Sequence, residues 1–314
     1  DVYKRQEYTK AFDLKIWKRL LPILARYKKT IVLMAVVNGL TAMMDVILPL
    51  FQKYAISRFI ERGTLDGLPL YTAAYLGVIL LETLMVVGWS RKAMYVEMYL
   101  GRDMRRDLFG HLQTLSLSFY NVTPVGYLIT RVMNDTNRIA GNIAWNLTDM
   151  AWSVLYVLST FAAMLALNWR LALVVILIVP AVAALTGCFQ PRILHWNRKV
   201  RKLNSKITGA FNEGITGAKT SKTLVIEDQS IKSFQELTDT MRGSGVRASR
   251  LNAVYIPLTL FFSTLTVAIV LLRGGYLTAE QALDISTLAV FVSYAMGIFE
   301  PIQITAANLA EFIA

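Results

Sequence analysis

Six apolar stretches, each about 20 residues long, constrain the fold of this chain more than any other feature of its sequence. They cover residues 30–50, 70–89, 147–167, 171–189, 253–272 and 283–304. An α-helix rises about 1.5 Å per residue, so each stretch is long enough to cross a hydrocarbon layer about 30 Å thick. The predicted fold class is therefore all-α, a polytopic membrane protein with six transmembrane helices.

The composition supports a membrane location. Hydrophobic residues make up 55% of the 314 residues, charged residues make up 17%, and the mean hydropathy is +0.45. Soluble domains have about 45–50% apolar and about 25% charged residues, which excludes an ordinary soluble protein. The net charge of +12 is compatible with nucleic-acid binding, but basic residues that alternate with apolar spans instead follow the positive-inside rule. No nucleic-acid partner is expected.

The connections between spans predict the topology. Residues 90–146 and 190–252 are long and polar, whereas residues 51–69, 168–170 and 273–282 form short connections. Of the 33 lysines and arginines, 28 precede residue 30 or lie in the two long connections. Because cytoplasmic loops carry the excess of Lys and Arg, both termini and both long loops are predicted to be cytoplasmic, in a multi-pass protein of the plasma membrane.

The two long loops are predicted to be helical. Apolar residues recur at helical spacing in both, at Leu100, Met104, Leu108 and Leu112 in the first and at Val200, Leu203, Ile207 and Phe211 in the second. The simplest structure continues each membrane helix outward, turns, and returns. About 25 residues per leg would project on the order of 40 Å. We call residues 90–146 the first rod and residues 190–252 the second rod.

Residues 1–29 are predicted to contain a tail and an interfacial elbow helix. Its apolar face carries Phe12, Ile16, Leu20, Ile23, Leu24 and Tyr27, and its basic side chains are Lys15, Lys18, Arg19 and Arg26. Such a helix suits a membrane surface with anionic lipid head groups. A soluble amphipathic helix that packs on another domain is the alternative. The chain lacks an initiator Met, so its first residues are expected to be those of a fragment.

The middle of each rod carries a distinctive group of residues. In the first rod these are Phe119, Tyr120, Thr123, Pro124, Gly126, Leu128, Thr130, Arg131 and Asp135. In the second they are Glu213, Gly217, Lys219 and Lys222. Thr123-Pro124 predicts a helix start, because Thr can cap a helix and Pro is tolerated in its first turn. A chain reversal is expected there, followed by a short helix across the tip.

With these motifs the sequence resembles the transmembrane domain of type IV ABC exporters over nearly its whole length, and the two groups resemble the family's coupling helices. Asn121 and Ser221 depart from the family pattern. The resemblance implies that residues 30–314 form the membrane domain of a half-transporter, without its nucleotide-binding domain. It also implies that both rod tips seat on ATP-binding domains, that the second rod crosses to a second transmembrane half, identical or different, and that ATP and Mg bind in the absent domain.

No catalytic, metal or cofactor site is predicted within the chain itself. Residues 214–220 superficially resemble a phosphate-binding loop, but Ala218 separates Gly217 from Lys219 within a helical pattern. His111 and His195 are far apart in the sequence and lack a cluster of Cys or carboxylate ligands. The single cysteine, Cys188, cannot form an intrachain disulfide and is interpreted as a small buried hydrophobic residue.

Two acidic residues inside apolar stretches are candidates for the substrate pathway. An ionised group at Asp45 or Glu82 is costly in a membrane unless it faces a cavity or a partner. Counted from the ends of the apolar stretches, the two differ by about 10 Å in depth, so they are not expected to form one site. They either favour cationic amphipathic cargo or make packing hydrogen bonds. Asp149 and Glu300, nearer the cytoplasmic interface, are interpreted as structural.

Aromatic and proline residues add two further hypotheses. Phe261, Phe291, Tyr294 and Met296 are candidates for adaptable contacts with cargo, with lipid-facing bulk as the alternative. Pro180, Pro257 and Pro301 are expected to kink their helices, either as a gate or as static packing.

The predicted function is ATP-driven export of amphipathic or hydrophobic drugs, lipids or peptides through an alternating-access pathway. The alternatives are an ATP-independent channel or secondary transporter, and a non-transporting regulatory subunit with the same fold. Against a channel or secondary transporter, the sequence shows no internal repeat, no broken helix pair at the midplane and no filter-like segment.

Overall fold

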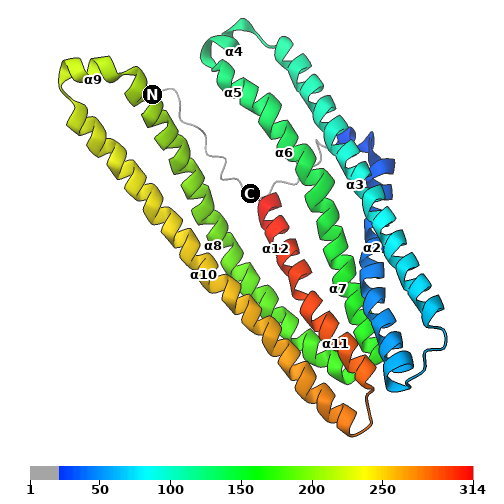
Figure 1. Cartoon of the computed structure of the whole chain (residues 1–314). Coiled ribbons are helices and arrows are strands. Elements are labelled where there is room, and N and C mark those ends of the chain that lie inside the picture. Colours follow the sequence, from blue (N-terminus) through cyan, green and yellow to red (C-terminus); the bar gives the residue numbers. More distant parts are fainter. Residues whose placement is uncertain (1–20, 314) are drawn as a thin grey trace. The chain divides into compact units, whose positions relative to one another are not determined.

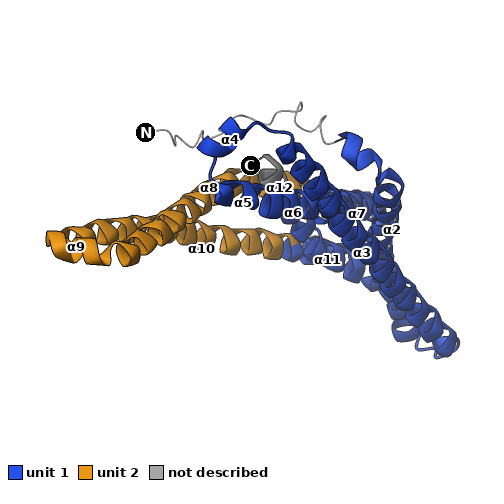
Figure 2. Ribbon diagram, turned by 90° about the horizontal axis from the view of Figure 1, so that it is seen from above, with its two compact units in different colours: residues 1–176, 267–314 blue, residues 177–266 orange. Residues whose placement is uncertain are grey.

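A computed structural model describes the backbone of residues 21–313 and the side chains of residues 21–308. The part of the chain that it describes is helical and contains no β-strand, which confirms the predicted fold class. Contacts divide the chain into two compact units (Figure 2). Unit 1 comprises residues 1–176 and 267–314, and unit 2 comprises residues 177–266.

Unit 1 contains most of the helices (Figure 1). Its first part runs through α2 (Lys28–Ala55), the π-helix η1 (Ile56–Glu61), α3 (Leu68–Gln113), α4 (Leu117–Val122), α5 (Val125–Thr130), the π-helix η2 (Arg131–Asp135), α6 (Thr136–Gly141), the π-helix η3 (Asn142–Asn146) and α7 (Leu147–Leu167). After unit 2 it ends with α11 (Ile285–Gly297) and α12 (Phe299–Ile313). The helices that join the units are α8 (Trp169–Thr216) and α10 (Glu227–Ala279), with α9 (Ala218–Leu224) between them.

Within the described residues, six helical segments are long and apolar enough to cross a membrane. They are Lys28–Glu61, Leu68–Gln113, Val125–Leu167, Trp169–Thr216, Glu227–Ala279 and Ile285–Asn308. Three of their helices continue far beyond the apolar stretch, since α3 has 46 residues, α8 has 48 and α10 has 53. At about 1.5 Å per residue these helices are roughly 70–80 Å long. The polar loops are therefore continuations of the membrane helices.

Helix α2 lies at the centre of the packing in unit 1. It contacts α3, α7 and α11, and its side chains Met34, Ala42 and Val46 are buried. Asn38 Nδ2 donates to the carbonyl of Thr148 at 3.1 Å, which satisfies a buried amide in an otherwise apolar contact. These contacts fix α2 against α3, which follows it closely, and against α7 and α11, which are distant in sequence.

The connection between α2 and α3 is short and rich in aromatic side chains. Gly63 and Gly67 have φ values of +64° and +86°, which other residues rarely adopt, so they allow the tight turn. Rings from α2, η1 and α3 pack together at centroid distances of 5.3–6.2 Å. They belong to Phe51, Tyr54, Phe59, Tyr71 and Tyr75. Aromatic rings of this kind are typical of the membrane–water interface.

Unit 2 is a pair of helical segments, from α8 and α10, closed by α9. Tyr255 from α10 stacks on Phe189 from α8 with centroids 5.8 Å apart, and its hydroxyl is 3.3 Å from Thr186 Oγ1. Farther along the pair, the ring of Trp196 lies under the guanidinium of Arg247, 4.8 Å from its centroid. The pair is therefore held by contacts along its length rather than by a single core.

One expectation about an individual residue was wrong. Cys188 was expected to be buried but is exposed, because its position on α8 faces away from the packed side of unit 2. Its Sγ lies 2.6 Å from the guanidinium of Arg192. The last span is interrupted at Ile298, between α11 and α12, three residues before Pro301. This agrees with the expected kink, because Pro301 has no N–H to bond to the carbonyl of Gly297 four residues earlier. Helices α8 and α10 continue through Pro180 and Pro257.

The packing of α2 predicts the effect of one glycine substitution. A Cβ atom at Gly39 would lie 2.7 Å from Cδ1 of Leu155 on α7, whereas a Cβ at Gly77 on α3 would meet nothing within 4 Å. We expect Gly39→Val to lower the free energy of unfolding by about 1–3 kcal/mol through overpacking. Gly77→Val is the matched control and is expected to stay within about 0.5 kcal/mol of wild type. Thermal unfolding in detergent measures both, and equal stability of the two variants would contradict the packing.

Candidate functional site

Two short helices form the tip of the first rod. Helix α4 lies at the end of the rod, between α3 and α5 (Figure 1). The hydroxyl of Tyr120 donates to the carbonyl of Leu112 at 2.6 Å and so ties α4 to the end of α3. The Phe119 and Tyr120 rings meet edge to face, with centroids 5.6 Å apart. The aromatic pair of the sequence motif thus has a local structural role at the reversal.

The chain reversal at Thr123 and Pro124 differs in detail from the predicted helix start. Thr123 does not cap the following helix, because Pro124 occupies the position before Val125 and no side chain caps α5. Both Thr123 and Pro124 have extended backbones. For Thr123 the reason is that a residue directly before a proline is disfavoured in the helical region. A short helix was expected after this pair, and the structure has one on each side of it.

An ion pair rigidifies the start of the return leg. Arg131 and Asp135 are joined by a hydrogen-bonded ion pair, and the guanidinium of Arg131 also lies 4.9 Å from the centre of the Tyr127 ring. The hydrogen bond to Asp135 raises the pKa of Arg131 above its ordinary value. Thr130 donates to the carbonyl of Gly126 at 2.9 Å, while the Cβ position of Gly126 is open. The tip is thus stabilised by contacts among its own residues, and the space beside Gly126 is open.

Apolar side chains at this tip are exposed. Leu117, Val122, Val125 and Ile129 each expose more than half of their surface. Among the motif residues, Phe119, Thr123, Leu128 and Asp135 are half-buried, while Tyr120, Pro124, Gly126 and Arg131 are exposed. Exposed apolar groups clustered at the end of a polar rod are typical of a surface that another protein covers.

The tip of the second rod is made by α9 and its two ends. Gly217 lies between α8 and α9, where a Cβ would be 2.9 Å from the backbone oxygen of Glu213, so only glycine fits without displacement. The side chains of Glu213, Lys219 and Lys222 are exposed. The sequence motif therefore combines one residue that makes the turn with three that face outward.

One residue of this tip has an unusual backbone. Val225 ends α9 with φ 55° and ψ 46°, a left-handed conformation that is strained for a β-branched residue. The N–H of Ile226 donates back to the carbonyl of Ser221 at 3.1 Å, which closes the helix end in the usual way for a left-handed cap. The Val225 side chain is 82% exposed. Sequence reasoning missed this residue, because glycine is the usual signal for such a cap.

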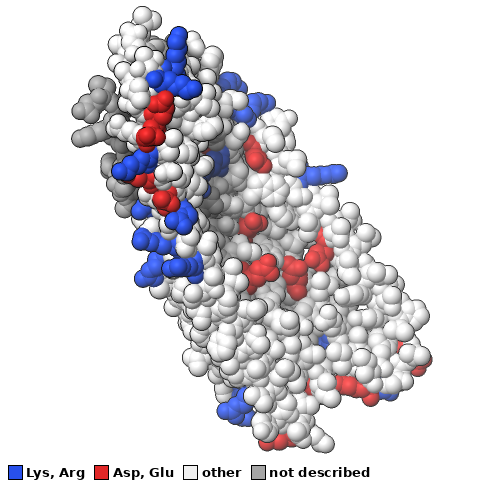
Figure 3. Space-filling view, turned by 60° about the vertical axis from the view of Figure 1, so that its left-hand side comes forward, with Lys and Arg blue, Asp and Glu red and all other residues white. Residues whose placement is uncertain are grey.

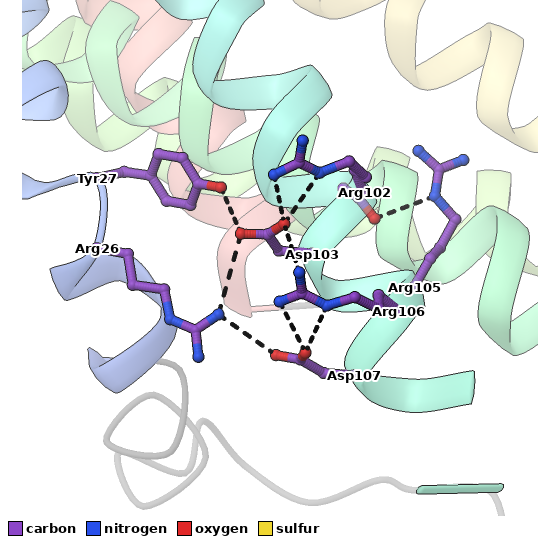
Figure 4. Close-up of polar contacts among 8 residues, drawn as sticks. Arg26, Tyr27, Arg102, Asp103, Arg105, Arg106 and Asp107 are labelled. Carbon is purple, nitrogen blue, oxygen red and sulfur yellow. Dashed lines mark hydrogen bonds and ion pairs between the residues drawn. The ribbon is translucent and has the colours of Figure 1, made fainter. Parts of the chain in front are cut away.

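A polar cluster fastens the segment before α2 to the first rod (Figure 4). The Tyr27 hydroxyl donates to Asp103 Oδ2 at 2.6 Å, and Arg102 approaches the other carboxylate oxygen at 2.8 Å. Arg26 lies 3.9 Å from Asp103 and 3.7 Å from Asp107. Asp103 is 6% exposed, so its charge requires these partners. Sequence reasoning missed this cluster, because Tyr27 and Asp103 are 76 residues apart.

The elbow helix is described only in its last part. Residues 21–25 are helical, and Ile23, Leu24 and Tyr27 pack on a cluster that includes Val96, Leu100 and Ile143. Phe12, Ile16 and Leu20, and the basic residues Lys15, Lys18 and Arg19, lie outside the described residues. The described part thus packs on the first rod beside the α2 span.

The two intramembrane carboxyl groups meet, contrary to expectation. The side chains of Asp45 on α2 and Glu82 on α3 lie close enough to interact with each other. The predicted difference of about 10 Å in depth was wrong, because both helices continue beyond their apolar stretches. Asp45 stands 17 residues before Arg62, where the first helix ends, and Glu82 stands 15 residues after Gly67, where the next begins. They are therefore at nearly the same depth in an antiparallel pair.

Aromatic groups from α7 border this acidic pair. Trp152 Nε1 donates to Asp45 Oδ2 at 3.1 Å, and the Tyr156 ring stacks on Trp152 with centroids 5.3 Å apart. On the face drawn in Figure 3, a group of acidic side chains lies within a broad zone that is otherwise almost uncharged. The acidic pair and its indole donor form a compact polar site within unit 1.

The other pathway candidates are not brought together. Phe291 and Tyr294 are fully buried, and the Tyr294 hydroxyl donates to the carbonyl of Val46 at 2.6 Å, which joins α11 to α2. Met296 is exposed in unit 1, and Phe261 is exposed in unit 2. No group of three or more His, Cys, Asp or Glu side chains within the described residues is arranged to hold a metal ion.

Comparisons with known proteins agree with this architecture. Residues 30–302 match the family described as ABC transporter transmembrane region. ABC transporter ATP-binding protein exp8 of Streptococcus pneumoniae is 24% identical over 289 residues, which are 91% of this chain and 49% of that protein. Multidrug export ATP-binding/permease protein YgaD of Bacillus subtilis is 24% identical over 294 residues, 92% of this chain and 51% of that protein. The chain thus spans about half the length of these curated relatives.

The cluster in Figure 4 predicts a pH dependence of stability. Burial, and then the hydrogen bond to Asp103, raise the pKa of Tyr27 from 10.0 to about 12, while that same hydrogen bond lowers the pKa of Asp103. Tyrosine in the unfolded chain ionises first, so the stabilisation by Tyr27 is complete below pH 10 and is lost as the pH rises to about 12. At the acid end, the contribution of Asp103 is lost as the pH falls through its lowered pKa.

We expect Tyr27→Phe to lower the free energy of unfolding by about 1 kcal/mol near neutral pH. The difference between wild type and this variant should shrink between pH 10 and about 12. Unfolding midpoints measured across this range test the prediction, with Tyr276→Phe, at a 69% exposed position, as the control. A wild-type-minus-variant difference that is constant with pH would contradict it.

Proposed function

The chain belongs to the family of ABC transporter transmembrane regions, and from this premise we propose that it is the membrane-crossing half of an ATP-driven exporter. Its cargo is proposed to be amphipathic or hydrophobic, as drugs, lipids and peptides are. The observation that carries the proposal is the pair of rods, each of which continues a membrane helix and ends in an exposed short helix. A channel or a secondary transporter has no use for such rods.

The proposed partners follow from the same features. The two tips dock on ATP-binding domains, and a second transmembrane half, identical or different, completes the pathway. ATP and Mg bind to those domains, because this chain has no Gly-Lys-Ser/Thr motif. The relatives, which are about twice as long, carry ATP-binding in their names. The termini and both rods are proposed to be cytoplasmic, in agreement with the distribution of Lys and Arg.

The proposed mechanism uses the continuity of the helices. A displacement of a tip by nucleotide-dependent movement of the ATP-binding domains passes along α3 or α10 into the membrane, because a helix resists bending along its backbone hydrogen bonds. The Tyr27–Asp103 contact makes the segment before α2 move with the first rod. The residues proposed to transmit this coupling are the motif residues at the two tips.

Cargo selection is proposed to involve the acidic pair. Asp45 and Glu82 lie on facing helices within the membrane-crossing part of unit 1, where an anionic group attracts a cationic amphipathic molecule. Phe261, Phe291, Tyr294 and Met296 are proposed to supply apolar contacts in the conformations that expose them.

The docking of the tips predicts specific crosslinks in the full-length transporter or with its ATP-binding partner. The experiment uses a Cys188→Ser background, because Cys188 is free and exposed. Gly126→Cys and Lys219→Cys, which place a thiol at each open tip, are expected to crosslink to cysteines on the ATP-binding domain, with yields that depend on bound nucleotide. Gly243→Cys, on α10 away from the tip, is the control and should not react. Absence of crosslinks from both tips in every nucleotide state would refute the proposal.

Charge selection predicts an asymmetric change in transport. Asp45→Asn is expected to reduce efflux of a cationic dye roughly tenfold, the equivalent of about 1.4 kcal/mol of lost attraction, and to leave efflux of an anionic dye of similar size nearly unchanged. Asp149→Asn is the control, since Asp149 lies at the start of α7. Equal losses for both dyes would show that Asp45 acts in packing and not in selection.

A further inference from the structure

The first turn of α11 is capped by a residue from another helix. Asp284, directly before α11, has an extended backbone with φ −75° and ψ 145° and is a residue type that caps helices well. Its side chain nevertheless makes no capping hydrogen bond. Instead, the N–H of Ser286 donates to Glu61 Oε1 at 3.3 Å, across 225 residues of sequence.

Glu61 is suited to this role by its place at the end of η1. The first N–H groups of a helix have no partner within the helix, and the positive end of the helix dipole favours a nearby carboxylate. Ser286 is fully buried, so its N–H cannot bond to solvent and depends on Glu61. The carboxylate of Glu61 thereby joins the outer end of the first span to the start of the last.

A second hydrogen bond joins α2 and α11, farther from their outer ends. The hydroxyl of Tyr294 on α11 donates to the carbonyl of Val46 on α2 at 2.6 Å. Any movement that separates the outer ends of α2 and α11 must break the Glu61 contact, which is nearer the ends, and leave the Ser286 N–H without an acceptor. Asp284 already has the backbone conformation of a cap, so rotation of its side chain is enough to replace Glu61.

We propose that Glu61 and Asp284 are alternative caps for α11 that exchange when the outer end of the transporter opens. Glu61 stabilises the closed outer end, in which α2 and α11 are in contact. Asp284 stabilises the open outer end, because it satisfies the same N–H after Glu61 has left. This inference rests on the proposed function, since alternating access supplies the movement that separates the two helices.

The test measures access to the outer end in the full-length transporter with its ATP-binding domains, reconstituted in nanodiscs. Thr287, which is 4% exposed at the start of α11, is replaced by Cys in a Cys188→Ser background, and its modification by a charged, water-soluble maleimide is timed. Without nucleotide, Glu61→Ala is expected to increase the modification rate about two- to tenfold. Glu61→Gln retains an acceptor oxygen and should give a smaller increase.

The reciprocal variant makes the test specific. With ATP bound and hydrolysis blocked, Asp284→Ala is expected to lower the modification rate by a similar factor, because the open end then lacks its cap. Asp66→Ala removes an acidic side chain from the same outer connection and is the matched control, with rates equal to those of the parent. Rates for Glu61→Ala and Asp284→Ala that equal those of Asp66→Ala, in a parent that responds to nucleotide, would overturn the exchange of caps.

Failure of the proposed function has a different signature. If the parent protein shows the same modification rate with and without nucleotide, the outer end does not respond to ATP, and both the exporter mechanism and the exchange lose their basis. If the parent responds and the two variants shift the rate in opposite directions, both proposals are supported.

Discussion

Satisfaction of backbone hydrogen bonds is the constraint on which the whole structure depends. In a hydrocarbon layer each N–H and C=O must find a partner within its own segment, so every span is helical. The same hydrogen bonds within the helix can form outside the lipid, so such a helix can continue beyond the hydrocarbon layer. Helices α3, α8 and α10 therefore continue through the interface, and the membrane part and the projecting parts consist of the same rigid elements.

Polar contacts between distant residues give this apolar bundle a unique arrangement. Apolar packing alone is nearly indifferent to small rotations of a helix in lipid, whereas a hydrogen bond between buried groups is directional. Asn38 with Thr148, Tyr294 with Val46, and Trp152 with Asp45 each join α2 to another helix in this way. Tyr27 with Asp103 does the same beyond the apolar stretch.

The spans and the general form of the rods could be predicted because they depend on local properties. Apolar length reveals a span, and apolar spacing reveals a helical leg. The meeting of Asp45 with Glu82 could not be predicted, because it depends on where α2 and α3 actually turn, which apolar boundaries do not mark. The cap from Glu61 and the Tyr27–Asp103 contact join residues far apart in the sequence, and no spacing of residues in the sequence predicts them. Val225 was missed because its conformation contradicts its residue type. The roles assigned to the tip residues stay predictions.

The π-helical segments η2 and η3 give the return leg of the first rod a property that the continuous α3 lacks. A π-helical turn bonds residue i to i+5 and so holds one more residue than the α-helical pattern. The extra residue is absorbed within that turn, so loss of one residue there restores an ordinary α-helix and leaves the residues beyond it in nearly the same phase. Insertion or deletion of a single residue in Arg131–Asp135 or Asn142–Asn146 can therefore be accommodated without turning the rest of the leg to another face. In the continuous α-helix of α3, the same change would rotate all that follows by about 100°.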